Sequence, residues 1–188
     1  MFKKVSNFLK TREEKQFSKL FSLPNNTKFI DISCGNGNEL KILKKYSPNL
    51  EGFGVDISRE ALNTAKIKNP WATFTVANAE NLPFPEETFD CIFSGMTWHH
   101  YPKPQLIFKE AKRVLKPKGQ FFILDLMPLN RFSQWLLNKD KCSEKYYFNK
   151  YFQANEIINL GKTYGFTLEK KTTVSWISAI KCLCFKKT

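Results

Sequence analysis

A turn with two glycines, between a predicted strand and a predicted helix, is the first place where the residue types of this chain could do chemistry. The stretch from Phe29 to Leu40 reads FIDISCGNGNEL, with alternating apolar residues ahead of the turn. Gly35 and Gly37 let the backbone approach a ligand with no side chain in between. The helix that follows offers free N–H groups and a positive dipole end to an anionic group. The pattern therefore indicates a ligand-binding turn.

An acidic residue, Asp56, ends the next predicted strand. It lies about 20 residues beyond the glycines, where a carboxylate accepts hydrogen bonds from ribose hydroxyls. A dinucleotide site would have a third glycine where this chain has Leu40, which disfavours NAD, an alternative that a nicotinamide titration would test. A ligand with a ribose and an amino-acid end fits better, because Asp31 lies near the mouth of the turn and could meet an ammonium group.

The elements that must position these residues alternate along the chain. Short apolar runs separated by amphipathic segments are typical of a parallel sheet covered on both faces. We therefore predict an α/β fold: a doubly wound, Rossmann-like, mostly parallel seven-stranded sheet with a C-terminal antiparallel hairpin and helices on both faces. The predicted strands are 28–33, 52–57, 72–77, 89–95, 120–126, 165–174 and 176–187; the predicted helices are 5–21, 39–46, 59–68, 105–115, 132–138 and 154–164; turns are predicted at 24–26 and 116–119.

The length of 188 residues fits a single domain. We divide it into an N-terminal helical segment (1–27), a core that binds the ligand (28–126), a cover over the substrate cavity (127–152), and a C-terminal helix and hairpin (153–188). No run of about 18 apolar residues or secretory signal is present, so we expect no transmembrane segment and a cytoplasmic protein. The five scattered cysteines are expected to be reduced and mostly buried.

The formal charge of +13 is unevenly distributed. Residues 51–100 hold three basic and seven acidic side chains, a net charge of −4, so the basic excess lies outside the presumed site. Such a surface favours RNA or an anionic membrane as a partner. The alternative is a solvated, lysine-rich surface with no partner, and we favour it.

Four stretches occur in a characteristic order: DISCGNG (31–37), GVDIS (54–58), NAENLPFPEETFD (78–90) and RVLKPKGQFFILD (113–125). Together they resemble the class I S-adenosylmethionine-dependent methyltransferases, specifically the type-11 group that includes the quinone-biosynthesis methyltransferases. The resemblance covers residues 28–126, and the tail 152–188 more loosely. It implies an enzyme that uses S-adenosyl-L-methionine to methylate a small or medium-sized organic acceptor.

The resemblance also implies which residues bind the cofactor. Asp31 and the backbone of 33–37 would hold the methionine part, Asp56 the ribose, and Ile57 would pack on adenine. The family usually has an aspartate where this chain has Asn78, whose amide oxygen can still accept a hydrogen bond from the adenine amino group. The predicted cofactor-binding residues are Asp31, Ser33, Cys34, Gly35, Asn36, Gly37, Asp56, Ile57, Asn78, Ala79, Glu80 and Ser94.

Both histidines of the chain, His99 and His100, lie in the loop SGMTWHHYPKP (94–104), which borders the methyl end of the cofactor in similar proteins. One of them could act as a general base or orient the acceptor. The alternative, which we favour, is that the pair has a structural role where a helix begins. They lack the partner cluster that a zinc site needs, so we predict no metal.

Aromatic residues are frequent in 127–152, and in this fold such an insertion commonly roofs the substrate cavity. Rings there would suit a planar or lipophilic acceptor, or a cation. The alternative is that they fill ordinary core. The candidate substrate contacts are Trp98, Tyr101 and Trp135.

Two further functions stay open from the sequence: an RNA methyltransferase that uses the basic surface, and a non-catalytic module that keeps the fold and the cofactor. The pattern does not specify the acceptor, the methylated atom or the oligomeric state.

Overall fold

A computed structural model describes residues 11–21, 23–139, 150–175 and 179–188 of the chain. Outside these ranges lie the start of the predicted N-terminal helix, Cys142 and the aromatic residues 146–148 of the predicted cavity cover.

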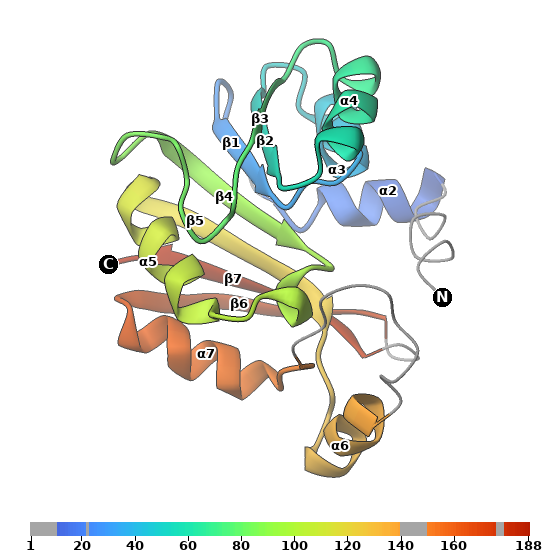
Figure 1. Ribbon diagram of the computed structural model, residues 1–188, viewed down its shortest axis with the longest axis vertical. Helices are drawn as coiled ribbons and strands as arrows, with labels where there is room; N and C mark the ends of the chain where they lie inside the picture. The colour runs from blue at the N-terminus through green and yellow to red at the C-terminus, as the bar shows by residue number, and fades with distance from the viewer. Residues whose placement is uncertain (1–10, 22, 140–149, 176–178) are drawn as a thin grey trace.

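The described residues form one seven-stranded sheet, with strand order β3-β2-β1-β4-β5-β7-β6. The strands β1 to β5 are parallel to one another, and β7 runs antiparallel between β5 and β6 (Figure 1). This is the predicted doubly wound sheet with its C-terminal hairpin. The strands are β1 (Lys28–Ile32), β2 (Glu51–Asp56), β3 (Thr73–Val76), β4 (Phe89–Gly95), β5 (Leu115–Leu126), β6 (Phe166–Ser175) and β7 (Ile180–Lys187).

Helices cover both faces of this sheet. The α-helices α5 and α7 pack on one face, and α2, α3 and α4 pack on the other (Figure 1). The helix α6 lies at one end of the molecule, apart from the sheet. The helices are α2 (Thr11–Ser18), α3 (Asn38–Tyr46), α4 (Arg59–Lys68), the 3-10 helix η1 (Trp98–His100), α5 (Pro104–Val114), α6 (Arg131–Lys139) and α7 (Ala154–Thr163).

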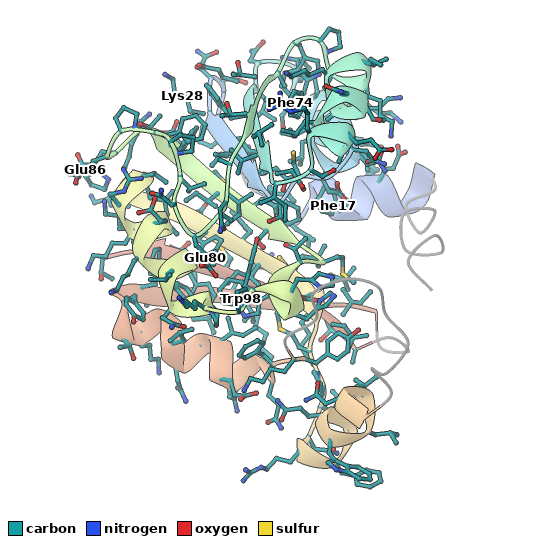
Figure 2. All side chains as sticks on the ribbon, viewed as in Figure 1. Phe17, Lys28, Phe74, Glu80, Glu86 and Trp98 are labelled. Carbon is teal, nitrogen blue, oxygen red and sulfur yellow. The ribbon has the colours of Figure 1, made fainter. Side chains whose placement is uncertain are left out.

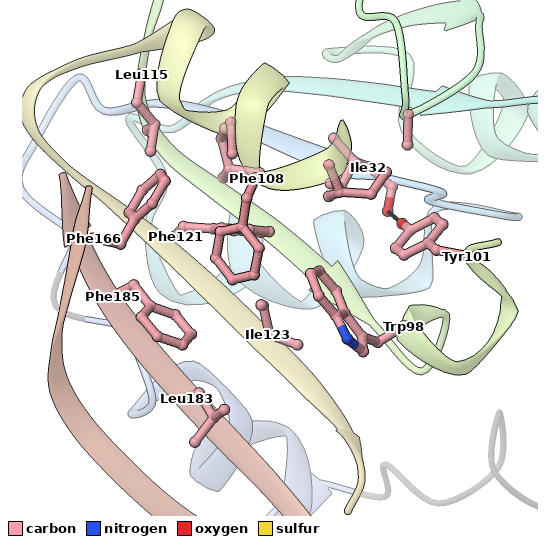
Figure 3. Close-up of a cluster of buried hydrophobic side chains, with 14 of the residues drawn as sticks. Ile32, Trp98, Tyr101, Phe108, Leu115, Phe121, Ile123, Phe166, Leu183 and Phe185 are labelled. Atoms are coloured by element: carbon pink, nitrogen blue, oxygen red, sulfur yellow. Dashed lines mark hydrogen bonds between the residues drawn. The ribbon is translucent and has the colours of Figure 1, made fainter. Parts of the chain in front are cut away.

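Strand side chains alternate between the two layers, as a period of two requires. On β1, Ile30 and Ile32 join the cluster beneath α5 and α7, whereas Phe29 joins the cluster beneath α2, α3 and α4. Figure 3 shows part of the first cluster, in which Phe108 of α5 lies over Phe121 of β5. A strand with a continuous apolar run, such as β5, is therefore buried on both faces: Phe121 joins the first cluster and Phe122 the second. Only the ends of such strands are left to form a binding site.

Most predicted bounds agree with the structure to within two residues. The predicted cap of α4 is present, because Ser58 Oγ accepts a hydrogen bond from the Ala61 N–H at 3.2 Å. The predicted turn at 116–119 is wrong in part: β5 begins at Leu115 and pairs there with Phe89, before the pairing register shifts. Lys118 takes a positive φ of 64° in this irregular stretch, so the chain bulges where a turn was expected.

The four cysteines in the described ranges are unbonded and buried, as predicted. No helix within those ranges has the length and apolarity needed to cross a membrane.

Candidate functional site

The carboxyl ends of the parallel strands meet at one edge of the sheet, and the predicted polar residues gather there. The strand order changes direction between β1 and β4, and such a point is where open α/β sheets bind ligands. β1 is followed by Ser33, β2 ends at Asp56, and β4 carries Ser94 near its end. The register that pairs β1 with both β2 and β4 places these three positions side by side.

The turn after β1 has three residues with positive φ: Ser33 at 64°, Gly35 at 50° and Gly37 at 71°. The two glycines serve different purposes. A Cβ on Gly35 would meet nothing within 4 Å, so this glycine faces open space, as a ligand cradle requires. A Cβ on Gly37 would come within 2.7 Å of Asn69 Nδ2, so this glycine allows α3 to start close against the end of α4.

Asp56 ties the glycine turn to the turn after β2. One carboxylate oxygen accepts a hydrogen bond from the Gly35 N–H at 2.8 Å, and the other accepts one from the Ser58 N–H at 2.8 Å. Each oxygen keeps a lone pair for a further donor. Next to it, the apolar side chain of Ile57 is 72% exposed, which is what a residue that packs on a flat aromatic ligand would present.

Asp31 is the most unusual titratable group at this edge. Its side chain is buried, and its Oδ2 has no hydrogen-bond partner among the described residues. Burial raises the pKa of the carboxyl well above its usual value, and the nearby Glu39 and Asp56 carboxylates raise it further. A buried carboxylate oxygen without a partner is costly in the folded protein, and a positive group placed beside it would offset that cost.

These features fit S-adenosylmethionine, which carries an ammonium group, a ribose and an adenine. Asp31 offers an unsatisfied acid, Gly35 an open approach, Asp56 a carboxylate and Ile57 an apolar surface.

The segment after β3 holds three of the predicted residues. Asn78 is exposed, and its Oδ1 accepts a hydrogen bond from the Glu80 N–H at 2.9 Å. Glu80 Oε1 in turn accepts one from the Lys103 N–H at 3.2 Å, which holds this segment against the start of α5, near the Glu80 label in Figure 2. Ala79 is buried in the core. Binding of adenine by Asn78 stays a prediction.

Tyr101 brackets the turn from the side of β4. Its hydroxyl lies 3.0 Å from Ser33 Oγ, 3.2 Å from Ser94 Oγ and 3.2 Å from Thr97 Oγ1. It also donates a longer hydrogen bond, at 3.5 Å, to the carbonyl oxygen of Ile32, visible in Figure 3. Burial raises the pKa of the Tyr101 hydroxyl, so it stays protonated at neutral pH. This network supports the strained Ser33 backbone.

The histidine pair lies in η1, and Asp125, which the sequence analysis did not single out, holds His99. Asp125 lies near the end of β5. Its Oδ2 accepts a hydrogen bond from the His99 backbone N–H at 3.0 Å, and its Oδ1 lies 2.8 Å from His99 Nδ1. Both side chains are buried. The signal in the sequence was an acid within the apolar run FFILDL. His100, whose ring centroid lies 4.1 Å from that of His99, is half-buried.

The three aromatic candidates for substrate contact lie in different surroundings. Trp98 is buried in the core against Phe108, and Tyr101 is buried in the network described above. Trp135 is 54% exposed on α6. Two other rings of the predicted cover are described: the ring centroid of Tyr151 lies 4.9 Å from that of His99, and Phe152 packs against the core. The role of all three candidates stays a prediction.

Comparison with known proteins shows the family of this chain. Residues 30–123, half of the chain, match the methyltransferase domain of the type-11 group. The chain belongs to this family. It is a member of the class I S-adenosylmethionine-dependent methyltransferases, as the four sequence stretches predicted.

Two relatives illustrate the match. The chain is 33% identical over 120 residues to a demethylmenaquinone methyltransferase of Thermotoga maritima, covering 64% of this chain and 52% of that protein. It is 32% identical over 108 residues to a phthiotriol/phenolphthiotriol dimycocerosates methyltransferase of Mycobacterium tuberculosis, covering 56% of this chain and 40% of that protein. The chain thus spans about half the length of the curated relatives it matches, or less.

The fold extends beyond the matched stretch. A SAM-dependent methyltransferase from Methanosarcina mazei superposes with a TM-score of 0.72 at 20% identity, covering 88% of this chain and 94% of that one. This likeness confirms the predicted Rossmann-like architecture.

Proposed function

We propose that this chain binds S-adenosylmethionine at the turn after β1 and transfers its methyl group to a lipophilic small-molecule acceptor. The observation that carries the proposal is the buried Asp31 carboxylate with an oxygen that lacks a partner, beside an open Gly35 and the strand-end Asp56. The family to which the chain belongs supports the cofactor, and the named substrates of the two relatives support a lipid-soluble acceptor.

In this proposal each residue has a distinct task. Asp31 pairs with the ammonium group, Asp56 accepts from the ribose hydroxyls, and Ile57 covers adenine. The bound cofactor supplies an electrophilic methyl group, so the chain has only to orient the acceptor and keep water out. Tyr101 and Ser94 hold the turn rigid from the β4 side.

The histidines divide into two roles. His99 is fixed by Asp125 through both its ring and its backbone, which supports a structural role for it. His100 is the better candidate to meet an acceptor, since it is half-buried at the same 3-10 helix.

Isothermal titration calorimetry with S-adenosylmethionine and S-adenosylhomocysteine tests the first half of the proposal. A transfer assay with radiolabelled cofactor and a short-chain demethylmenaquinone, followed by organic extraction, tests the second half. Absence of cofactor binding by the folded protein at millimolar concentration would refute the proposal. Binding without transfer to any extractable acceptor would favour the non-catalytic module.

An RNA acceptor is a second candidate, favoured by the net charge of +13. In that case labelled methyl groups would enter RNA, and RNA binding would weaken steeply with added salt. Lack of RNA binding at low salt would exclude it.

A further inference from the structure

The helix α6 is amphipathic in the opposite sense to the helices that cover the sheet. Its polar face points toward the protein: Gln134 Nε2 donates to Glu156 Oε2 at 2.7 Å and to the Tyr151 carbonyl oxygen at 2.9 Å. Asn138 Oδ1 accepts from the Tyr151 N–H at 3.0 Å. Hydrogen bonds therefore attach α6 to the segment that leads into α7.

The apolar side of the same helix faces solvent. Phe132 is 70% exposed and Leu136 is 54% exposed, and Leu129, just before the helix, is 68% exposed. Trp135, also 54% exposed, stacks on Phe132 with 6.0 Å between ring centroids. Positions 132, 135 and 136 follow the i, i+3, i+4 spacing of one helix face, opposite to Gln134 and Asn138. By contrast, the apolar side chains of α3 and α5 are buried.

These four apolar side chains form what we call the α6 patch: Leu129, Phe132, Trp135 and Leu136. A contiguous patch of this kind on a protein surface commonly marks a contact with a partner. With roughly 150–250 Å² for an aromatic side chain and less for a leucine, it exposes on the order of 400 Å². The apolar part of one partner's share of a standard protein–protein interface has about the same area, so area alone does not choose between a second copy of the chain and a lipid surface. The charge and the residue types around the patch make that choice.

Charge and residue type favour a lipid surface. Tryptophan and phenylalanine beside cationic residues are typical of helices that lie in the membrane–water boundary. Arg131 on α6 is exposed, and residues 131–150 hold five basic and two acidic side chains. The chain as a whole carries +13, which attracts it to anionic headgroups.

We propose that α6 docks in the interface of an anionic lipid membrane, with Phe132 and Leu136 inserted among the acyl chains and Arg131 among the headgroups. α6 begins at Arg131, five positions after the last residue of β5. The same end of β5 carries Asp125, which contacts the histidine turn. Docking of α6 would therefore bring this edge of the sheet near the lipid. That this gives a lipophilic acceptor a short path to the site rests on the proposed function; the docking itself does not.

Flotation with vesicles of phosphatidylcholine, with and without phosphatidylglycerol, tests the docking. The wild type is expected to float with the anionic vesicles and to dissociate as salt rises. The variant F132S/L136S should bind them about tenfold more weakly or worse, because the inserted apolar surface is lost. The matched control is Ile67→Ser, which removes an 83% exposed apolar side chain on α4, outside the patch, and should bind like the wild type.

Calorimetry with S-adenosylmethionine on the same three proteins keeps the two proposals separate. If the cofactor does not bind but flotation follows the pattern above, the docking of α6 stands, and only the claim that it gives an acceptor a short path to the site is refuted. Equal flotation of wild type and F132S/L136S, or no flotation of the wild type, would overturn the docking. A dimer in sedimentation velocity that F132S/L136S abolishes would overturn it as well, since the α6 patch would then join two copies of the chain.

Discussion

Replacing Asp31 by asparagine is expected to stabilise the protein and at the same time weaken its binding of S-adenosylmethionine. The substitution keeps the shape of the side chain and removes a charge that is buried, that lies near two other carboxylates, and whose Oδ2 lacks a partner in the described structure. The buried charge thus lowers the stability of the free protein, and pairing with a bound cation would offset that loss.

The stability effect follows from the direction of the pKa shift. The pKa of Asp31 is higher in the folded than in the unfolded protein, so folding favours the protonated carboxyl. The free energy of unfolding of the wild type therefore falls as pH rises through the raised pKa. The variant does not titrate there. Its advantage should therefore be absent below about pH 3.9, the usual pKa of an aspartate, and should grow toward pH 8. Each unit by which burial raises the pKa of Asp31 corresponds to about 1.4 kcal/mol of stability that the variant keeps at high pH, and each kcal/mol shifts the Tm of a chain this long by about 2–4 °C.

The binding effect has the opposite sign. A hydrogen bond to a charged group contributes about 1.5–3 kcal/mol, so losing it should raise the Kd for S-adenosylmethionine by about 10- to 150-fold. The ligand 5′-methylthioadenosine has the same nucleoside but no amino-acid end. Its affinity should be unchanged in the Asp31→Asn variant.

Differential scanning fluorimetry from pH 5 to pH 8 and calorimetry with both ligands provide the assay. Asp56→Ala serves as the matched variant, because loss of the ribose contact should weaken both ligands, by about 1–3 kcal/mol. The reasoning would be refuted if Asp31→Asn were no more stable than wild type at pH 8, or if it weakened the two ligands equally.

Four further substitutions probe the rest of the site. Gly35→Val should abolish cofactor binding, because its side chain would fill the open space, and its positive φ adds a backbone cost of about 1–2 kcal/mol. Normal affinity in calorimetry would contradict this. Gly37→Ala should instead lower the Tm, because its Cβ would clash with Asn69. Asp125→Ala should destabilise the protein by about 1–3 kcal/mol in urea unfolding, since the buried His99 N–H and Nδ1 lose the hydrogen bonds to Asp125, and an unchanged free energy of unfolding would show that the pair is dispensable. His100→Ala should lower methyl transfer without changing cofactor affinity, and turnover that survives across pH would exclude it as a base.

The sequence by itself determined the layers of this protein and the sheet edge at which most of the predicted cofactor residues lie. Alternating apolar residues mark strands, and helical spacing marks the segments between them, because these periods follow from local backbone geometry. Residues at the end of a parallel strand must lie at the same sheet edge as those of its neighbours, so Asp31 and Asp56 could be placed together from their positions alone.

Only the tertiary structure decided how these residues are held. Tyr101 meets Ser33 across 68 positions of sequence, and Asp125 meets His99 across 26, through pairings that strand register and loop closure set. No local pattern specifies which strand end will face which loop, because these hydrogen bonds depend on the packing of the whole sheet. The same holds for α6: its spacing predicts an amphipathic helix, but that its apolar side faces outward follows from the partners its polar side finds near α7.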